Sequence, residues 1–377
     1  MKRSTKILLL ATAATAFALA VGEIAARCLP KPQPLGRLSY QTAGGEPVAD
    51  IVEAARRGFV VPLPPDQTPR PRYQFAPGLD FFLCYTDNDR LHRDWLDERG
   101  RVPVHINRFG VRERDEITPD KPAGEKRIVC IGDSFTFGWG VRAEDCWVRL
   151  LEDALRKDGK NVRTVNCGAS GTVVVDEYVA GLQHRFARFG PDAVILTICL
   201  NDLIPCSGLF VQGPAVDTGS RLLDLLVGAM RGGPLELDPA VDWVDLLLKL
   251  PAADGMQAGL YGENNPFDAL WEQGGPQRAL ASMKAWCDER KIAPMIVLWP
   301  FLQGLGEHRH YPFAKLHTMV ADECRRLGLP FLDVLPALRG TRSEDLWVTP
   351  ADMHPNPNAM RLALPLVREF VNAHADL

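Results

Sequence analysis

Four short polar segments of this 377-residue chain together hold the side chains that nucleophilic catalysis requires. They are residues 132–138 (GDSFTFG), 166–171 (NCGASG), 201–202 (ND) and 352–356 (DMHPN). A serine hydroxyl becomes reactive when a neighbouring base removes its proton, and histidine is the side chain that most often acts as this base. Ser134 is therefore a candidate nucleophile and His354 a candidate general base, provided that the fold brings these distant segments together.

The elements that must position these segments are strands alternating with helices. Short apolar runs rich in β-branched residues predict five buried strands, at 128–131, 162–165, 193–200, 295–299 and 331–334. Helical spacing predicts helices at 147–155, 178–189, 279–289, 317–327 and 359–373. This alternation indicates a mainly parallel five-stranded sheet covered on both faces. Because ligand crevices lie beyond the carboxyl ends of such strands, the polar segments after the strands are expected to share one crevice.

In this order and context, the four segments resemble the motif blocks of the SGNH hydrolases, also called the GDSL-like esterases. The resemblance covers residues 126–374, about two thirds of the chain. It implies a flavodoxin-like three-layer α/β/α fold and a serine esterase. By this resemblance Ser134 would be the nucleophile, His354 the base that later donates its proton to the leaving alcohol, and Asp352 the carboxylate that orients the imidazole. The backbone N–H groups of Ser134 and Gly171 and the side-chain amide of Asn201 would bind the oxyanion.

The spacing of the last segment departs from the commoner pattern of that family. Many members place the aspartate three residues before the histidine, where this chain has Ala351, whereas Asp352 lies two residues before His354. The segment resembles the Asp-x-His-Pro-Asn variant, and two alternatives stay open: a Ser–His–Asp triad, or a Ser–His dyad assisted by a backbone carbonyl. Simpler roles also stay open, with Asp133 as a helix cap and Asn201 as a cap at a strand end.

The N-terminus has the pattern of an export signal. Basic residues precede an apolar run at 7–22, and an Ala-Leu-Ala step ends at Ala20, where cleavage is expected. The run is slightly shorter than the roughly 20 apolar residues of a usual spanning helix, although residues 24–26 would extend it. A cleaved signal and an uncleaved anchor formed by residues 7–26 are therefore both open. Either would place the rest of the chain outside the cytoplasm, in the periplasm or secreted.

Composition predicts how the rest of the chain is divided. The segments are the signal or anchor at 1–26, an extended arm rich in Pro, Gly and Arg at 27–72, a small β-rich appendage at 73–125, and the hydrolase domain at 126–377. An insertion at about 203–270 carries amphipathic helical patterns at 222–226 and 243–248. It leaves the crevice rim just after Asn201, so a lid over the site and a packed decoration are both open interpretations.

The charge and the cysteines of the chain bear on whether it binds nucleic acid, metals or organic cofactors. The net charge is −4, from 43 basic and 47 acidic residues, and no basic stripe follows the N-terminus, so nucleic acid is not an expected partner. The nine cysteines show no C-x-x-C spacing, and neither a metal nor an organic cofactor is expected.

The sequence therefore predicts an exported serine esterase that hydrolyses a carboxylic ester, of a small molecule or a polysaccharide, through an acyl-enzyme on Ser134. Two alternatives stay open. An O-acetyltransferase or deacetylase of an exported polysaccharide would use the same site. A catalytically silent carbohydrate-binding or assembly protein would keep the fold alone. No sequence feature indicates the oligomeric state.

Overall fold

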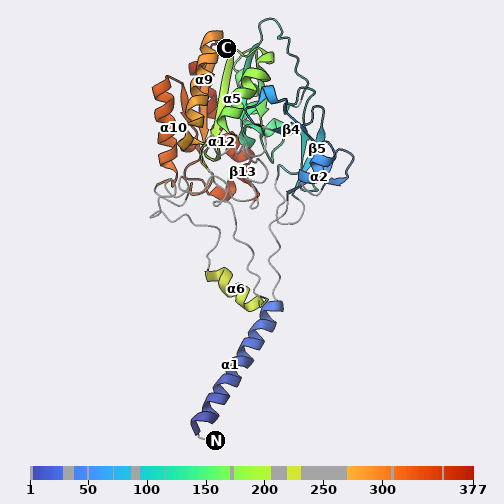
Figure 1. Cartoon of the computed structure of the whole chain (residues 1–377), viewed down its shortest axis with the longest axis vertical. Helices are drawn as coiled ribbons and strands as arrows, with labels where there is room; N and C mark the ends of the chain where they lie inside the picture. Colours follow the sequence, from blue (N-terminus) through green and yellow to red (C-terminus); the bar gives the residue numbers. More distant parts are fainter. Residues whose placement is uncertain are drawn as a thin grey trace. The chain divides into compact units, whose positions relative to one another are not determined.

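The computed structural model divides the chain into two units (Figure 1). One unit comprises Met1–Pro34 with Ser207–Asp238, and the other Leu35–Cys206 with Pro239–Leu377. The described residues are 3–28, 38–48, 51–70, 72–85, 94–113, 115–169, 174–204, 219–230, 270–306, 310–349 and 352–377. The candidate site residues all belong to the second unit.

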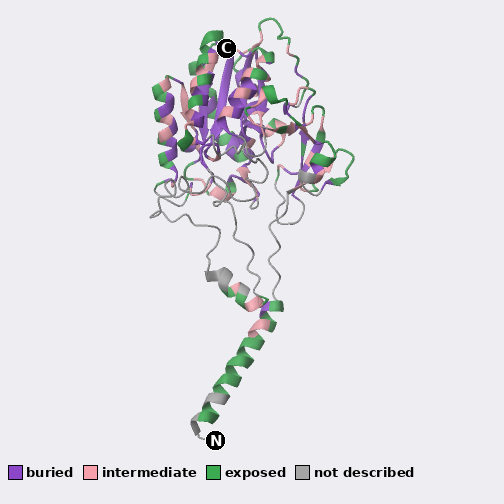
Figure 2. Cartoon of the chain, in the orientation of Figure 1, coloured by how far each residue is buried: buried purple, intermediate pink, exposed green. Residues whose placement is uncertain are grey.

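The second unit is built on a parallel five-stranded sheet. In spatial order the strands are β11 (Phe331–Asp333), β10 (Ala293–Trp299), β9 (Ala193–Cys199), β7 (Lys126–Gly132) and β8 (Val162–Gly168). All neighbouring pairs are parallel. Counted along the chain, the spatial order is 2-1-3-4-5, which is the flavodoxin-like order and confirms the predicted fold class. The strands form the buried centre of the unit (Figure 2), and every residue of β9 is buried, which explains its continuous apolar sequence.

Helices cover both faces of this sheet. They are α4 (Trp147–Lys157), α5 (Val175–His184), α9 (Gly275–Arg290), α10 (Ala314–Leu327) and α12 (Pro357–His374), with short helices α3 (Ser134–Phe137) and α11 (Leu335–Leu338). Single 3-10 turns occur at Pro65–Gln67, Ala143–Asp145, Phe186–Phe189, Leu200–Asp202, Trp271–Gln273 and Ser343–Asp345. Helix α4 packs against α12, whereas α9 packs against α5 and α10. Right-handed crossovers running in opposite directions along a sheet place their helices on opposite faces, so these two groups form the outer layers.

The N-terminal part of the same unit forms a second, antiparallel sheet. Its spatial order is β2 (Pro47–Val48), β1 (Leu38–Thr42), β5 (Asp80–Tyr85) and β6 (Arg101–His105), with helix α2 (Ile51–Arg56) and a hairpin of β3 (Val60–Pro62) and β4 (Tyr73–Phe75). A β-rich appendage is thus present, but β1, β2 and β3 lie where an extended arm was expected. Strand β1 owes its form to the pairing of all its residues with Phe81–Tyr85 of β5 and to the packing of Tyr40 near Phe81, with ring centroids 6.2 Å apart.

Arginine–carboxylate pairs fasten this N-terminal region to helix α5. Arg70 donates hydrogen bonds of 2.9 and 2.6 Å to Asp176, and Arg72 donates bonds of 2.7 and 3.0 Å to Glu177. The Glu177 side chain is only 3% exposed. Paired hydrogen bonds of this kind fix orientation as well as distance. The N-terminal region is therefore held in a defined position against the parallel sheet and its covering helices.

The first unit contains two described helices, α1 (Arg3–Cys28) and α6 (Arg221–Met230). Helix α6 occupies the first helical pattern of the insertion, while the second, at 243–248, lies outside the described residues. The Glu23 carboxylate of α1 accepts hydrogen bonds from the Ser220 hydroxyl at 2.8 Å and from the backbone N–H groups of Arg221 and Leu222 at 3.0 and 2.9 Å. It thereby caps the N-terminus of α6. The bond from Leu222, together with those from Arg27, Ser220 and Arg221, lowers the pKa of Glu23 to about 2.

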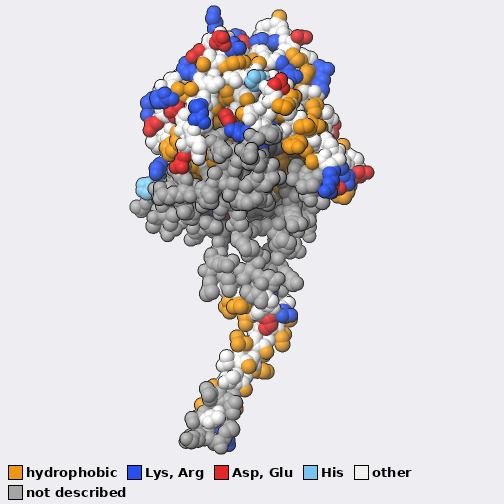
Figure 3. Space-filling view, viewed as in Figure 1, with side chains coloured by type: hydrophobic (Ala, Val, Ile, Leu, Met, Phe, Trp, Pro, Cys, Tyr) orange, Lys and Arg blue, Asp and Glu red, His pale blue; other side chains and the backbone are white. Residues whose placement is uncertain are grey.

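Helix α1 has the length and composition of a membrane-spanning helix. Within the described part of the chain, the segment Thr5–Cys28 is the one helix that meets this description. Figure 3 shows hydrophobic side chains on the surface of the coloured part of this helix, and the large exposed ones are Ile7, Leu10, Phe17, Leu19, Val21 and Ile24. A signal sequence near an N-terminus has the same character. The apolar helix fits both N-terminal interpretations, and export stays a prediction.

A buried ionic cluster joins the segment before β7 to α4 and β8. Arg149 lies 2.9 Å from Glu152 and 3.4 Å from Glu113, and both carboxylate side chains are fully buried. Glu113 also accepts the backbone N–H of Asn166, in β8, at 2.7 Å. Burial raises the pKa of Glu113 despite these partners. Removal of one member of such a cluster leaves a buried charge without its partner, which is strongly destabilising.

We expect Glu113→Ala to lower the free energy of unfolding by about 3 kcal/mol, because it leaves Arg149 less compensated in the interior. Urea titration followed by circular dichroism measures this loss. Glu116→Ala is the matched control, since this side chain is 53% exposed and 3.5 Å from Arg108, and a surface pair of this kind contributes at most about 1 kcal/mol. Equal losses in the two variants would contradict the assignment of the cluster as a structural link.

Candidate active site

Ser134 begins helix α3 directly after strand β7. Asp133 accepts the backbone N–H of Phe135 at 2.9 Å, so it has the capping role that its position suggested. On the neighbouring strand, a Cβ atom at Gly168 would lie 2.1 Å from the backbone nitrogen of Phe137. Only a glycine lets the two backbones approach this closely. This packing places the half-buried Ser134 at the carboxyl end of β7.

Asp352 and His354 lie on a two-stranded hairpin, β12 (Trp347–Thr349) and β13 (Asp352–Pro355). The sequence indicated only that they follow the last strand of the sheet, because the hairpin is too short to leave a recognisable pattern. Asn356 fixes its end, because its Oδ1 accepts the N–H groups at the start of α12 and its Nδ2 donates to the Trp347 carbonyl at 3.0 Å. Ala351 lies outside the described residues.

A chain of hydrogen bonds connects the three residues predicted to react. His354 Nε2 lies 2.8 Å from Ser134 Oγ, and His354 Nδ1 lies 2.5 Å from Asp352 Oδ1. The backbone N–H of His354 donates to the same carboxylate oxygen at 3.2 Å. The acceptor beside Nδ1 is thus the Asp352 carboxylate and not a backbone carbonyl. The geometry brings together a serine hydroxyl, an imidazole and a carboxylate in the arrangement that the predicted triad requires.

The electrostatics of the pair favour a charged imidazole beside a charged carboxylate. Burial lowers the pKa of His354, but the charge and hydrogen bond of Asp352 outweigh it, and the pKa lies above 6.5. Burial raises the pKa of Asp352, but the charge of His354 and the hydrogen bonds from His354 and Tyr85 outweigh it, so this pKa falls. Burial raises the pKa of Asp133 to about 6. The charged Asp352 carboxylate therefore favours the protonated form of the His354 ring, which is the form a general base would reach on taking a proton.

Aromatic rings surround the imidazole. The ring centroids of Phe135 and Trp139 lie 5.9 and 6.1 Å from that of His354, and Phe135 packs edge-on against Trp299 of β10 at 5.9 Å. The His354 side chain retains 30% of its exposure, against 9% for Asp352. These contacts restrict rotation of the ring and exclude water from part of the site, which strengthens its hydrogen bonds.

The predicted oxyanion-binding groups are only partly within the described residues. Gly171 lies outside them, so the structure does not describe that donor. Asn201 lies in the turn Leu200–Asp202, immediately after β9. The next residue anchors this turn, because Asp202 accepts the backbone N–H of Cys199 at 3.0 Å and the hydroxyl of Tyr178 at 2.7 Å. Asn201 therefore lies on a hydrogen-bonded turn that directly follows β9, the strand paired with β7.

Two residues that precede the hydrolase domain, Tyr85 and Arg112, also contact this region, and the sequence did not predict either contact. Tyr85 donates a hydrogen bond of 2.6 Å to Asp352 Oδ2. Arg112 is buried and donates to the carbonyls of Phe137 at 2.7 Å, Gly138 and Val141 at 2.5 Å. Burial lowers the pKa of Arg112 to about 10. Arg112 therefore fixes the loop after α3.

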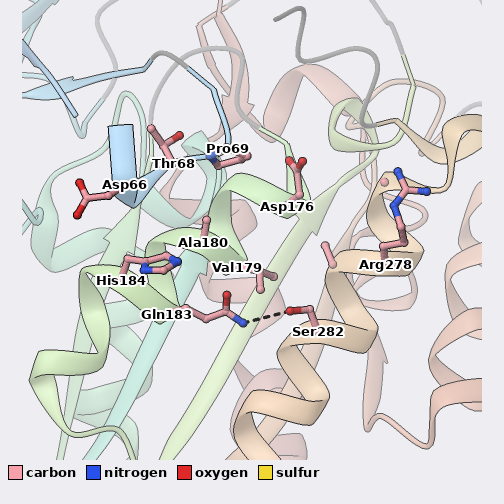
Figure 4. Close-up of a pocket in the computed structure, with 12 residues that line it drawn as sticks. Asp66, Thr68, Pro69, Asp176, Val179, Ala180, Gln183, His184, Arg278 and Ser282 are labelled. Carbon is pink, nitrogen blue, oxygen red and sulfur yellow. Dashed lines mark hydrogen bonds between the residues drawn. The ribbon is translucent and has the colours of Figure 1, made fainter. Parts of the chain in front are cut away.

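A separate hollow of about 380 Å³ lies between the arm before β4 and helices α5 and α9 (Figure 4). Its polar lining residues include Asp66, Asp176, His184 and Arg278. Neither Ser134 nor His354 lines it, so this hollow is distinct from the hydrogen-bonded site. Among the residues described, no group of three or more His, Cys, Asp or Glu side chains is arranged to hold a metal ion.

Residues 130–362, more than half of the chain, match the family described as the GDSL-like Lipase/Acylhydrolase family. The chain belongs to this family. The resemblance noted in the sequence is thus confirmed and, at the level of the family, so is the prediction of a hydrolase acting on ester bonds.

Individual relatives are more distant. An arylesterase of Vibrio mimicus is 34% identical over 80 residues, which are 21% of this chain and 39% of that relative. The chain thus spans well under half the length of this curated relative. Among solved structures, the lipase/acylhydrolase from Enterococcus faecalis has 13% identity and a TM-score of 0.40, covering 67% of this chain and 97% of its own. The psychrotrophic esterase EstA from Pseudoalteromonas sp. has 13% identity and a TM-score of 0.38, covering 66% and 96%.

We expect ester turnover to rise with pH through a midpoint above the ordinary histidine value of 6.5, because an imidazole can serve as a base only when deprotonated and the pKa of His354 is raised. Asp352→Asn removes the charge that raises this pKa and leaves the burial that lowers it. The midpoint of the residual activity should then fall by about one unit. The pH profile of p-nitrophenyl acetate hydrolysis measures this shift. Asp345→Asn, at a side chain that is 58% exposed, is the control, and an unmoved midpoint in Asp352→Asn would refute the coupling.

Proposed function

We propose that this protein is an exported serine esterase that hydrolyses carboxylic esters through an acyl-enzyme on Ser134. The observation that carries the proposal is the position of His354, whose two ring nitrogens lie 2.8 Å from the Ser134 hydroxyl and 2.5 Å from the Asp352 carboxylate. Membership of a family of lipases and acylhydrolases supports it. A serine held against an oriented base is an activated nucleophile.

In this mechanism the Ser134 oxygen attacks the carbonyl carbon of the ester while His354 Nε2 takes the hydroxyl proton. The resulting oxyanion would accept hydrogen bonds from the backbone N–H groups of Ser134 and Gly171 and from the Asn201 amide. When the intermediate collapses, the bond to the alcohol breaks and the imidazolium returns its proton to the leaving oxygen. Water then attacks the acyl-enzyme by the same sequence, releasing the carboxylic acid. A sugar hydroxyl in place of water would instead complete an acyl transfer.

We expect Ser134→Ala to lower kcat for p-nitrophenyl acetate by at least about a thousandfold, because the covalent step needs this hydroxyl. His354→Ala should cost a similar factor, and the double variant little more, since the two residues act as one unit. Ser282→Ala, which removes a hydroxyl of α9 that contacts Gln183 at 3.2 Å, is the control. Near-normal turnover by Ser134→Ala, with a folded protein, would rule out the proposed acyl-enzyme.

We also propose that α1 is retained after export and anchors the protein to the membrane. Cleavage after Ala20 would leave Glu23 on a stub of eight helical residues, although Glu23 caps α6 through three hydrogen bonds. Leu222 of α6 also packs on α1, where a Cβ atom at Gly22 would lie 3.0 Å from it. Isolated helices this short are unstable, so the contact is better supported by an intact α1.

N-terminal sequencing of the exported protein tests this second proposal. We expect a membrane-bound product that begins at residue 1 or 2, extractable with detergent but not with alkaline carbonate. A soluble product that begins at Val21 would show that α1 is a cleaved signal instead.

A further inference from the structure

The tyrosine that ends strand β5 reaches the carboxylate of the candidate triad from outside the hydrolase domain. Tyr85 Oη lies 2.6 Å from Asp352 Oδ2, although 267 positions separate the two residues in the sequence. The other oxygen, Oδ1, already faces the ring and the backbone N–H of His354. The Tyr85 bond therefore engages the side of the carboxylate that His354 leaves open.

Strand β5 and the loop that contains Gly140 both accommodate this contact. Tyr85 is 2% exposed, and its backbone is held by pairing with Leu38 of β1 and by an N–H bond of 2.8 Å to the Gly100 carbonyl. On the hydrolase side, a Cβ atom at Gly140 would lie 2.7 Å from the Tyr85 hydroxyl. A glycine at this position of the loop is what leaves room for the tyrosine.

We propose that Tyr85 is a positioning residue of the active site, so that the N-terminal sheet completes the hydrolase rather than decorating it. The inference rests on the proposed function of Ser134, His354 and Asp352. Tyr85 acts through Asp352 in two ways. It fixes the carboxylate in the rotamer that presents Oδ1 to His354, and its hydrogen bond spreads the negative charge.

The charged and titratable groups around this contact come from several elements. Asp352 faces His354 on its own strand and Tyr85 on β5. His354 additionally faces Asp133, at the end of β7. Tyr85 faces Asp352, Arg112 and Tyr40, and burial, followed by the charge of Asp352, raises its pKa far above 10. Tyr85 is thus a neutral donor over the whole pH range in which the esterase would work.

Loss of the Tyr85 hydroxyl should shift the pH dependence of turnover in one direction. In Tyr85→Phe, the Asp352 carboxylate keeps more of its charge for the neighbouring imidazole and is held less firmly. A proton on His354 is then bound more tightly, so the acidic limb of the kcat/KM profile should move to higher pH by about half a unit. A loss of kcat of about tenfold should accompany it, from the weakened orientation of the base. KM should stay unchanged, since Tyr85 does not touch the substrate in the proposed mechanism.

The experiment measures p-nitrophenyl acetate hydrolysis by the full chain against pH, for wild type and Tyr85→Phe. Tyr311→Phe is the matched control, because this buried tyrosine also loses one hydrogen bond, of 2.8 Å to the Phe301 carbonyl, but has no contact with Asp352. It should leave kcat and the pH profile unchanged. If both variants lose stability equally but only Tyr85→Phe shifts the profile, the effect is one of positioning.

A second pair of variants shows whether Tyr85 acts through Asp352. In an Asp352→Ala background, Tyr85→Phe should change kcat by less than about twofold, because the partner through which it acts is gone. An undiminished effect there, or a wild-type profile for Tyr85→Phe while Ser134→Ala is inactive, would overturn this inference alone. Full turnover by Ser134→Ala would instead overturn the proposed function, and this inference with it.

Discussion

The hydrogen bond between the Ser134 hydroxyl and His354 Nε2 governs how the whole site is built, since its 2.8 Å joins residues 220 positions apart. The parallel sheet satisfies half of this constraint by ending β7 beside β9 at one edge, with Gly168 allowing α3 to begin there at close range. The hairpin β12–β13 satisfies the other half. Its end is fixed by Asn356, which caps α12, so the histidine is held by the same residue that starts the last helix.

Residues of the N-terminal region also help to hold this site in place, although they lie outside the hydrolase domain. Arg70 and Arg72 fix its position on α5, Arg112 fixes the loop after α3, and Tyr85 completes the shell of Asp352. Outer contacts of this kind determine how accurately a catalytic group is held, because a carboxylate with one free oxygen can rotate. The protein thus builds one site from segments that the sequence separates into an appendage and a domain.

The sequence predicts the parallel sheet and its helices well, because the patterns that indicate each of these elements are local. Strand β9 is a run of seven buried residues and α4 an amphipathic helix, and the order of the motifs indicates which strand ends matter. Strand β1 could not be predicted, because five residues next to Pro and Gly take their form from pairing with β5. Tyr85 could not be predicted either. A tyrosine in a short strand has no pattern that distinguishes a core residue from one that contacts a carboxylate 267 positions away.

Covalent labelling with a fluorophosphonate shows whether His354 activates Ser134. The reagent phosphonylates a serine only where a neighbouring base has activated its hydroxyl. We expect one label per chain, located on Ser134 by mass spectrometry of the digested protein, and no label at this position in His354→Ala. A label on another residue of an active protein, or equal labelling of Ser134 when His354 is absent, would contradict it.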